Sequence, residues 1–249
     1  MDPHLEYLLR LADNALILGQ RLSEWCGHAP VLEEDLALAN MALDLIGQAR
    51  ALLTLAGQRE GKGRDEDRLA FLREAHEYRN VTLVELPNDD FARTTVRNLM
   101  MSAFNVELGK ALCASVDHEL AQVAQKSLKE VRYHFQHAAD WTIRLGDGSD
   151  ESHHRSQEAL DALWPYTAEL FGRDAIDDAA EAARIGIGWD ALEAPWRAAL
   201  DPVLDQATLT IPAPSAPISS GKTGRHSPDF PALLAEMQYL QRAYPGARW

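Results

Sequence analysis

The 249-residue sequence has few cysteines and few positive charges for its length. Its two cysteines, Cys26 and Cys113, form no paired-cysteine motif, which is more typical of a reducing compartment than of a disulfide-stabilised scaffold. There are 24 Lys and Arg against 38 Asp and Glu, so the formal net charge is −14. A field of this sign repels phosphate backbones and anionic lipid headgroups. We therefore expect neither nucleic acid nor a membrane surface as a partner.

The sequence also lacks long apolar runs and the alternation of a β-strand. No uninterrupted apolar run approaches the roughly 18 residues of a membrane helix. The first residues, MDPHLEYLLRLAD, carry acidic side chains where a secretory signal would carry positive charge. No glycine-rich phosphate loop, nucleophile elbow or Cys–His pair is present. These absences favour a cytoplasmic protein and leave no candidate catalytic residue.

Apolar residues recur at helical spacing over nearly the whole chain. Helices are predicted over residues 4–25 and 31–57, from about 67 toward 87, from 88 to about 112, after 117 as far as LGDGSD, over 156–171 with a kink at Pro165, and over 231–245. In the 31–57 segment one helix face comprises Leu32, Leu36, Ala39, Leu43, Ile46 and Leu53, and a second apolar flank comprises Met41, Leu45 and Leu52. Two apolar flanks are typical of a central helix in a bundle.

The pattern predicts an all-α fold of long antiparallel helices, namely a ferritin-like four-helix bundle with additional C-terminal helices. We expect a single domain over residues 1–249. Within it, residues 212–231, PAPSAPISSGKTGRHSPDFP, are expected to form a loop without regular structure. Trp141, Trp164 and Trp196 are expected to anchor the core or an interface.

One stretch contains metal-ligand residue types at helical spacing. KEVRYHFQHAADW, residues 129–141, places Glu130, His134 and His137 on a single helix face. A carboxylate with two imidazoles is a ligand set that iron, zinc or manganese uses. A ferritin-like dinuclear site, however, needs a Glu from each of two helices and Glu-x-x-His from each of two others.

The remaining parts of that dinuclear site are not found. The only literal Glu-x-x-His runs from Glu151 to His154 and lies in a polar segment just after the LGDGSD turn. The central helix offers Asp44, but three residues later comes Gly47, which has no side chain to ligate. The first helix offers only Asp13 or Asn14. We therefore expect no metal site and no cofactor in this chain.

Three interpretations of these polar residues remain open. Asn40, Asp44 and Gln48 form a polar stripe that could bond to neighbouring helices. A second interpretation is a metal-free vestigial cluster, in which an ammonium replaces the metal between carboxylates. Its members would be Asp44, Glu107, Lys110, Glu130 and His134, with Lys110 as a buried cation. The third is metal binding, either as a functional dinuclear site or as one adventitious zinc or iron.

Four long stretches carry a resemblance to a known family. They are GQRLSEWCGHAPVLEEDLALANMALDLIGQAR, LKEVRYHFQHAADW, LWPYTAELF and LLAEMQYLQRAYPGARW. They closely resemble the structural subunits of bacterial ring-1,2-phenylacetyl-CoA epoxidases, multicomponent di-iron monooxygenases of aerobic phenylacetate catabolism. The resemblance covers essentially the whole chain.

The resemblance implies a non-catalytic subunit that supports a paralogous di-iron catalytic subunit, in a heterodimer that dimerises further. An NADPH-dependent flavin and iron–sulfur reductase would supply electrons, and phenylacetyl-CoA would bind at the level of the complex. The alternative function is a self-contained di-iron carboxylate oxidase or an iron-binding ferritin-like protein.

The resemblance also implies contacts with the CoA substrate. The matching residues are Glu77, Tyr78, Arg79 and Asn80, together with Asp178, Ala179 and Ala180. Arg79 suits a phosphate and Tyr78 suits the face of an adenine. The alternative is that residues 77–80 form a solvated helix end.

Overall fold

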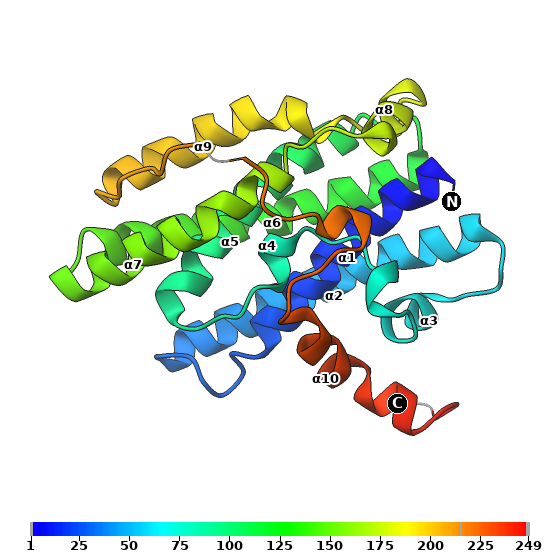
Figure 1. The fold of residues 1–249 in the computed structure, drawn as a ribbon, viewed down its shortest axis with the longest axis horizontal. Helices are drawn as coiled ribbons and strands as arrows, with labels where there is room; N and C mark the ends of the chain where they lie inside the picture. The colour runs from blue at the N-terminus through cyan, green and yellow to red at the C-terminus, as the bar shows by residue number, and fades with distance from the viewer. Residues whose placement is uncertain (1, 215, 248–249) are drawn as a thin grey trace. The chain divides into compact units, whose positions relative to one another are not determined.

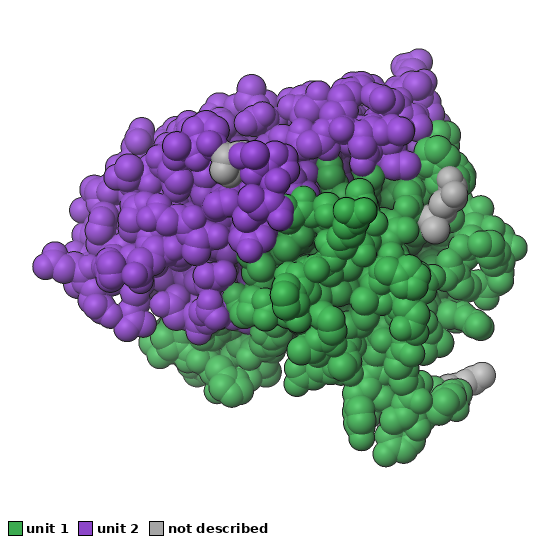
Figure 2. Space-filling model, in the orientation of Figure 1, with its two compact units in different colours: residues 1–87, 219–249 green, residues 88–218 purple. Residues whose placement is uncertain are grey.

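The computed structural model describes residues 2–214 and 216–247, and regular structure in these ranges is helical apart from one isolated bridge (Figure 1). The all-α class is therefore confirmed. The chain divides into two compact units (Figure 2): unit 1 comprises residues 1–87 and 219–249, and unit 2 comprises residues 88–218. The single domain expected from the sequence stays a prediction.

Unit 1 is built on a pair of long antiparallel helices, α1 and α2. Its helical segments are α1 (Pro3–Ser23), α2 (Leu32–Glu60), α3 (Glu66–Phe71), η1 (Ala75–Glu77), α4 (Thr82–Glu85), η4 (Gly221–Thr223) and α10 (Phe230–Ala243). The carboxylate of Asp2 caps α1 by accepting the N–H of His4 at 3.1 Å, as a favoured N-cap residue does. Gly19 lets α1 approach α2 closely, since a Cβ there would lie 3.3 Å from the Ala42 carbonyl oxygen.

The buried face of α2 is mainly the second of the two apolar flanks predicted from the sequence. Its buried apolar residues are Leu38, Met41, Ala42, Leu45, Ala49, Leu52, Leu53, Leu55 and Ala56. Leu32, Leu36 and Leu43, from the other predicted flank, are 71%, 57% and 66% exposed. The helix is apolar on nearly all sides, so periodicity alone could not determine which side faces the core.

The prediction of one continuous helix from about residue 67 toward 87 is wrong. The segment instead folds as the short elements α3, η1 and α4. Between them, the backbone N–H of Arg79 donates to the Asp13 carboxylate, and that of Val81 donates to the Asn14 side chain, both at 2.8 Å. These donors bond to side chains of α1 instead of to carbonyls of their own helix, so tertiary contacts override the local preference.

Unit 2 contains a second antiparallel pair, α5 and α6, with shorter elements after it. Its helical segments are α5 (Phe91–Leu112), α6 (His118–Gly146), α7 (Asp150–Leu163), η2 (Trp164–Glu169), α8 (Ala175–Ala182), η3 (Trp189–Leu192) and α9 (Glu193–Gln206). The indole of Trp196 donates to the Met100 carbonyl at 2.9 Å and so ties α9 to α5. After Leu163 the helix tightens into η2, whose second residue is Pro165, so the regular α-helix is interrupted where the sequence predicted a kink or offset.

The two antiparallel pairs and the helices after them are consistent with a ferritin-like bundle that has additional C-terminal helices. Residue 215 of the predicted 212–231 loop lies outside the described residues. The described part is irregular over most of its length, but it contains η4, the bridge between Ser220 and Arg225, and the start of α10 at Phe230. Among the described residues, α2 alone is long and apolar enough, by length and composition, to cross a membrane. That is weak evidence, because the core helix of a soluble protein passes the same test.

Candidate functional site

The two candidate metal ligands of the first helix, Asp13 and Asn14, are already bonded to other residues. Asp13 is fully buried and forms an ion pair with Arg73, whose side chain is only 2% exposed. Burial by itself lowers the pKa of the Arg73 guanidinium, but the neighbouring Asp13 carboxylate outweighs this, so the pKa is raised overall and the side chain stays charged. Asp13 and Asn14 also accept the backbone donors of Arg79 and Val81. The polar atoms that a metal would need therefore hold the 73–81 segment in place.

The expectation that Lys110, in unit 2, is a buried cation is wrong. Lys110 and Glu107 form an ion pair within α5, with 2.6 Å between Nζ and Oε1, but the Lys110 side chain is 49% exposed. A lysine at this exposure keeps much of its hydration, so it does not replace a metal between buried carboxylates. The sequence placed both residues on a helix correctly but could not show which side of that helix faces solvent.

The remaining metal-ligand types of unit 2 lie along α6 and α7. On α6, His134 is buried, while Glu130 and His137 are partly exposed. On α7, Glu151 pairs with Arg155, and His154 pairs with Glu158. Those two pairs lie on an exposed face of the helix, where ligation of an enclosed metal is not expected.

The donor set does not fit a metal centre. Over residues 2–214 and 216–247, no group of three or more His, Cys, Asp or Glu side chains is arranged to hold a metal ion. On α2, Asp44 is partly exposed and Gly47 contributes no ligand. The vestigial cluster of Asp44, Glu107, Lys110, Glu130 and His134 loses its predicted buried cation, because Lys110 is exposed. An approach of Asp44 to the other carboxylates and His134 stays a prediction, since Asp44 belongs to unit 1 and the others to unit 2.

The segment Glu77–Asn80 is mostly internal. Tyr78 is fully buried; its hydroxyl bonds the Ala70 carbonyl at 2.5 Å, and burial raises its pKa. Its ring is therefore not available to an adenine base. Asn80 is fully buried as well. Glu77 and Arg79 are partly exposed, although the Arg79 guanidinium is held by Glu6 at 2.5 Å. Substrate contact by this segment stays a prediction that depends on Glu77 and Arg79.

The second predicted contact segment belongs to unit 2. Asp178 is exposed and pairs with Arg173, Ala179 is partly exposed, and Ala180 is fully buried. The hydrogen bonds that the Arg173 guanidinium donates to Glu181 first, and then to Asp178, raise its pKa. The structure accounts for these residues as an ion-pair cluster and the buried face of α8, and their contact with substrate stays a prediction.

A buried polar latch in unit 1 has no counterpart among the sequence-based predictions. Glu85 is fully buried, and its carboxylate accepts from the side-chain amide of Asn80 at 2.8 Å and from the backbone N–H of Ser227 at 2.5 Å. The ring of His226 lies 2.7 Å from the same carboxylate. These bonds hold the 219–227 loop against α4. Gly221 fits there because a Cβ would lie 2.3 Å from the Asn80 carbonyl oxygen.

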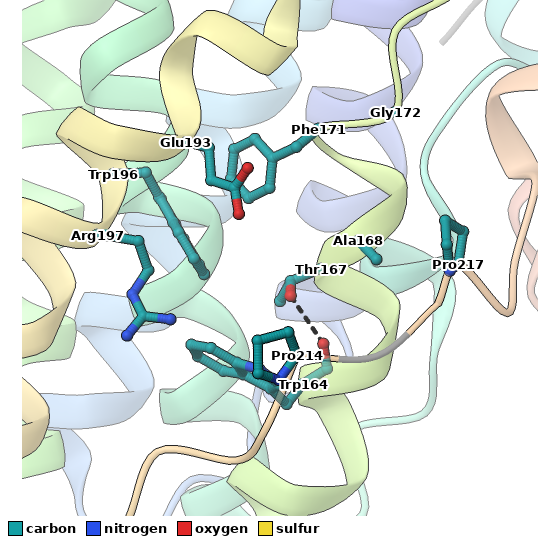
Figure 3. A pocket seen from close by; sticks show the side chains of 10 residues that line it. All are labelled: Trp164, Thr167, Ala168, Phe171, Gly172, Glu193, Trp196, Arg197, Pro214 and Pro217. Atoms are coloured by element: carbon teal, nitrogen blue, oxygen red, sulfur yellow. Dashed lines mark hydrogen bonds between the residues drawn. The ribbon is translucent and has the colours of Figure 1, made fainter.

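Unit 2 also has an aromatic-walled pocket of about 280 Å³ (Figure 3). It is lined by Trp164, Thr167, Ala168, Phe171, Gly172, Glu193, Trp196, Arg197, Pro214 and Pro217. The centroids of Trp164 and Trp196 are 5.6 Å apart, and those of Phe171 and Trp196 are 5.0 Å apart. The two indoles are buried, as expected for core anchors, and both line the pocket.

Comparison with known proteins decides the family. Residues 1–249 match the family described as phenylacetic acid catabolic protein. The chain belongs to this family. It is also 47% identical over 249 residues to a subunit of the 1,2-phenylacetyl-CoA epoxidase of Escherichia coli (strain K12), and the alignment covers 100% of both chains.

The resemblance inferred from the sequence is therefore confirmed. In this chain Asp13, one of the two candidate ligands on the first helix, is held in a buried ion pair with Arg73. The relative is named as one subunit of an epoxidase.

Proposed function

We propose that this chain is the structural, non-catalytic subunit of a phenylacetyl-CoA 1,2-epoxidase complex that acts in aerobic phenylacetate degradation in the cytoplasm. The observation that carries the proposal is the 47% identity to an epoxidase subunit over the full length of both chains. The alternative, a self-contained di-iron oxidase or iron-binding protein, has less support because the donor set does not fit a metal centre.

The residues of unit 1 support a role without a metal. A metal ligand on the first helix must be free to leave its hydrogen-bond partners. If Asp13 did so, the guanidinium of Arg73 would stay buried without a partner for its charge. On α2, Gly47 stands where a Glu-x-x-His pattern starting at Asp44 would need its histidine. In the proposed complex the di-iron centre belongs to a paralogous catalytic subunit. A separate NADPH-dependent flavin and iron–sulfur reductase supplies the electrons.

The exposed side of α2 is a suitable surface for that catalytic subunit. Val31 precedes the helix, and Leu32, Leu36 and Leu43 follow on its exposed side, each at least 49% exposed. Clustered large aliphatic side chains on a surface mark an interaction site more often than scattered ones. In the proposed assembly the partner covers this row, and the resulting heterodimer dimerises further.

Paired substitutions on this row are expected to weaken the complex. Leu36→Asp with Leu43→Asp should lower recovery of the catalytic subunit in co-purification by about tenfold or more, because two charges would be buried at the interface. Since both positions are exposed, far-ultraviolet circular dichroism and the melting temperature should stay close to those of the parent. Leu240→Asp on α10, another exposed leucine, is the matched control and should leave recovery unchanged.

Co-expression tests the supporting role directly. The catalytic chain should be more soluble and more active in phenylacetyl-CoA epoxidation when this chain is present. Equal solubility and activity in its absence would contradict the proposal. Stoichiometric recovery of the Leu36→Asp, Leu43→Asp variant would instead place the interface on another surface of the chain.

A further inference from the structure

The aromatic-walled pocket of unit 2 has an acidic group at its opening. The Glu193 carboxylate lies in front of the Phe171 ring, with the edge of Trp196 beside it (Figure 3). Glu193 is exposed, and its side chain makes no hydrogen bond or ion pair with any other residue that the structure describes. It is the first residue of α9, where the helix dipole stabilises a negative charge. The pocket thus presents a charge that no side chain balances.

The positive charge in the pocket is already paired. The guanidinium of Arg197 bonds the Asp201 carboxylate at 2.7 Å and lies 5.2 Å from the centroid of the Trp164 ring. Arg197 lies one turn after Glu193 on α9, but the two side chains form no ion pair, and an anionic ligand would have to compete with Asp201 for the guanidinium. The pocket has aromatic walls together with polar lining groups, and its unpaired charge, that of Glu193, is negative.

The surroundings strengthen this negative field. Arg173 follows the pocket residue Gly172, and three carboxylates surround its guanidinium: Asp178 at 2.8 Å, Glu181 at 2.5 Å and Asp190 at 3.1 Å. Three acids around one guanidinium leave an excess of negative charge beside the pocket. Such an excess attracts cations and repels anions.

We propose that this pocket binds an organic cation, namely an ammonium or guanidinium group on a short apolar stem. The stem lies in the pocket against the rings of Trp164, Trp196 and Phe171, which pack on one another, and the cation pairs with Glu193 at the opening. The ring atoms contact the apolar stem, and the unpaired Glu193 carboxylate accepts a charge-assisted hydrogen bond from the cation. A free amine and the side chain of a Lys or Arg on a partner protein both carry this chemistry. The proposal does not depend on the epoxidase role.

The test follows the indole N–H resonances of the intact chain during titration with butylammonium. The signals of Trp164 and Trp196 should shift saturably, while those of the other tryptophans serve as internal references. Butanol has the same stem without charge, and butyrate carries the opposite charge. We expect butanol to bind at least about tenfold more weakly than butylammonium and butyrate to cause no shift.

Two matched variants locate the charge. Glu193→Gln should weaken butylammonium binding by about tenfold. Glu236→Gln, which changes an exposed and unpaired glutamate of α10 in unit 1, should bind like the parent. Unchanged affinity in Glu193→Gln, or equal affinity for butanol and butylammonium, would overturn the proposal, since the site would then be an apolar pocket without selectivity for cations.

Blocked amino acids identify the source of the cation. If N-acetyl-lysine methylamide or N-acetyl-arginine methylamide binds at least as tightly as butylammonium, a side chain from a partner protein is the occupant. If only butylammonium binds, the occupant is a small free amine. If none of the three cations shifts the two indole signals, the proposal is wrong, and the epoxidase role is untouched because neither its interface nor its metal content involves this pocket.

Discussion

Replacing Arg73 with Met should destabilise the protein by about 3–5 kcal/mol, the usual effect of breaking a buried ion pair by removing one partner. The Asp13 carboxylate is fully buried and would lose its guanidinium partner. The same guanidinium also donates to the carbonyls of Leu69 at 2.5 Å and Glu77 at 3.0 Å, so these groups lose a donor as well. The melting temperature measured by circular dichroism should fall by roughly 6–20 °C.

The double variant Arg73→Met, Asp13→Asn should recover part of this loss. Asparagine carries no charge, and its side-chain oxygen still accepts the backbone N–H of Arg79, which lies 2.8 Å from Asp13. The coupling between the two positions is the measure of the ion pair. If the double variant melts no higher than Arg73→Met alone, repulsion from an unpaired Asp13 is not the cause of the instability.

Lys110→Met is the control for this experiment. It removes a cation of the Lys110–Glu107 pair that is 49% exposed, and exposed pairs contribute about 0–1 kcal/mol. From the sequence alone, Lys110 was expected to be the buried cation, so Lys110→Met was expected to be the strongly destabilising substitution. If Lys110→Met destabilises the chain as much as Arg73→Met does, the ranking by burial is wrong.

Replacing Glu85 with Leu should release the 219–227 loop and destabilise unit 1 by about 3–5 kcal/mol. The substitution leaves the amide of Asn80 and the backbone N–H of Ser227 without their acceptor, and it removes the carboxylate that faces His226. Limited proteolysis should then cut within the 219–227 loop at least about tenfold faster, because local opening becomes less costly.

Glu74→Leu is the matched control for the latch. Glu74 pairs with Arg242 at 3.0 Å, but its side chain is 64% exposed, so its loss should leave both stability and cleavage close to the parent. Unchanged cleavage in Glu85→Leu would show that the loop is held mainly by its backbone packing around Gly221, where a Cβ would lie 2.3 Å from the Asn80 carbonyl oxygen.

The fold class and most long helices could be predicted because they depend on local rules. α5 begins after Asp90, whose carboxylate accepts the N–H of Arg93, and α6 begins after Asp117, which accepts the N–H of Leu120. Asp at the N-cap followed by apolar residues at helical spacing is visible in the sequence. The approximate ends of these long helices therefore followed from the residues alone.

Contacts between distant residues could not be predicted in this way. The segment around Arg73 has the composition of a helix, yet Asp13 and Asn14, roughly 60 or more positions earlier in sequence, bond its backbone and side chain in another conformation. For α2, both flanks are apolar, so the exposure of Leu36 and Leu43 depends on what α1 covers. Long-range partners decided both cases.

In the candidate site, too, features that depend on local spacing could be predicted, and features that depend on distant residues could not. The missing histidine partner of Asp44 could be seen directly in the sequence because the residue at that spacing is Gly47. The latch at Glu85 depends on His226, 141 positions later, and the pocket brings Phe171 and Trp196 together. A single sequence contains no periodic signal for pairings over such separations.

The iron content of the chain purified alone tests most directly whether it lacks a metal centre. The protein is loaded with ferrous iron without oxygen, desalted and assayed for bound iron, and the near-ultraviolet oxo-bridge absorption is then recorded after exposure to oxygen. We predict iron well below one atom per chain and no oxo-bridge band, because Asp13 remains paired with Arg73 and Gly47 offers no ligand. About two irons per chain with a developing oxo-bridge band, the content of a dinuclear site, would contradict a metal-free structural subunit.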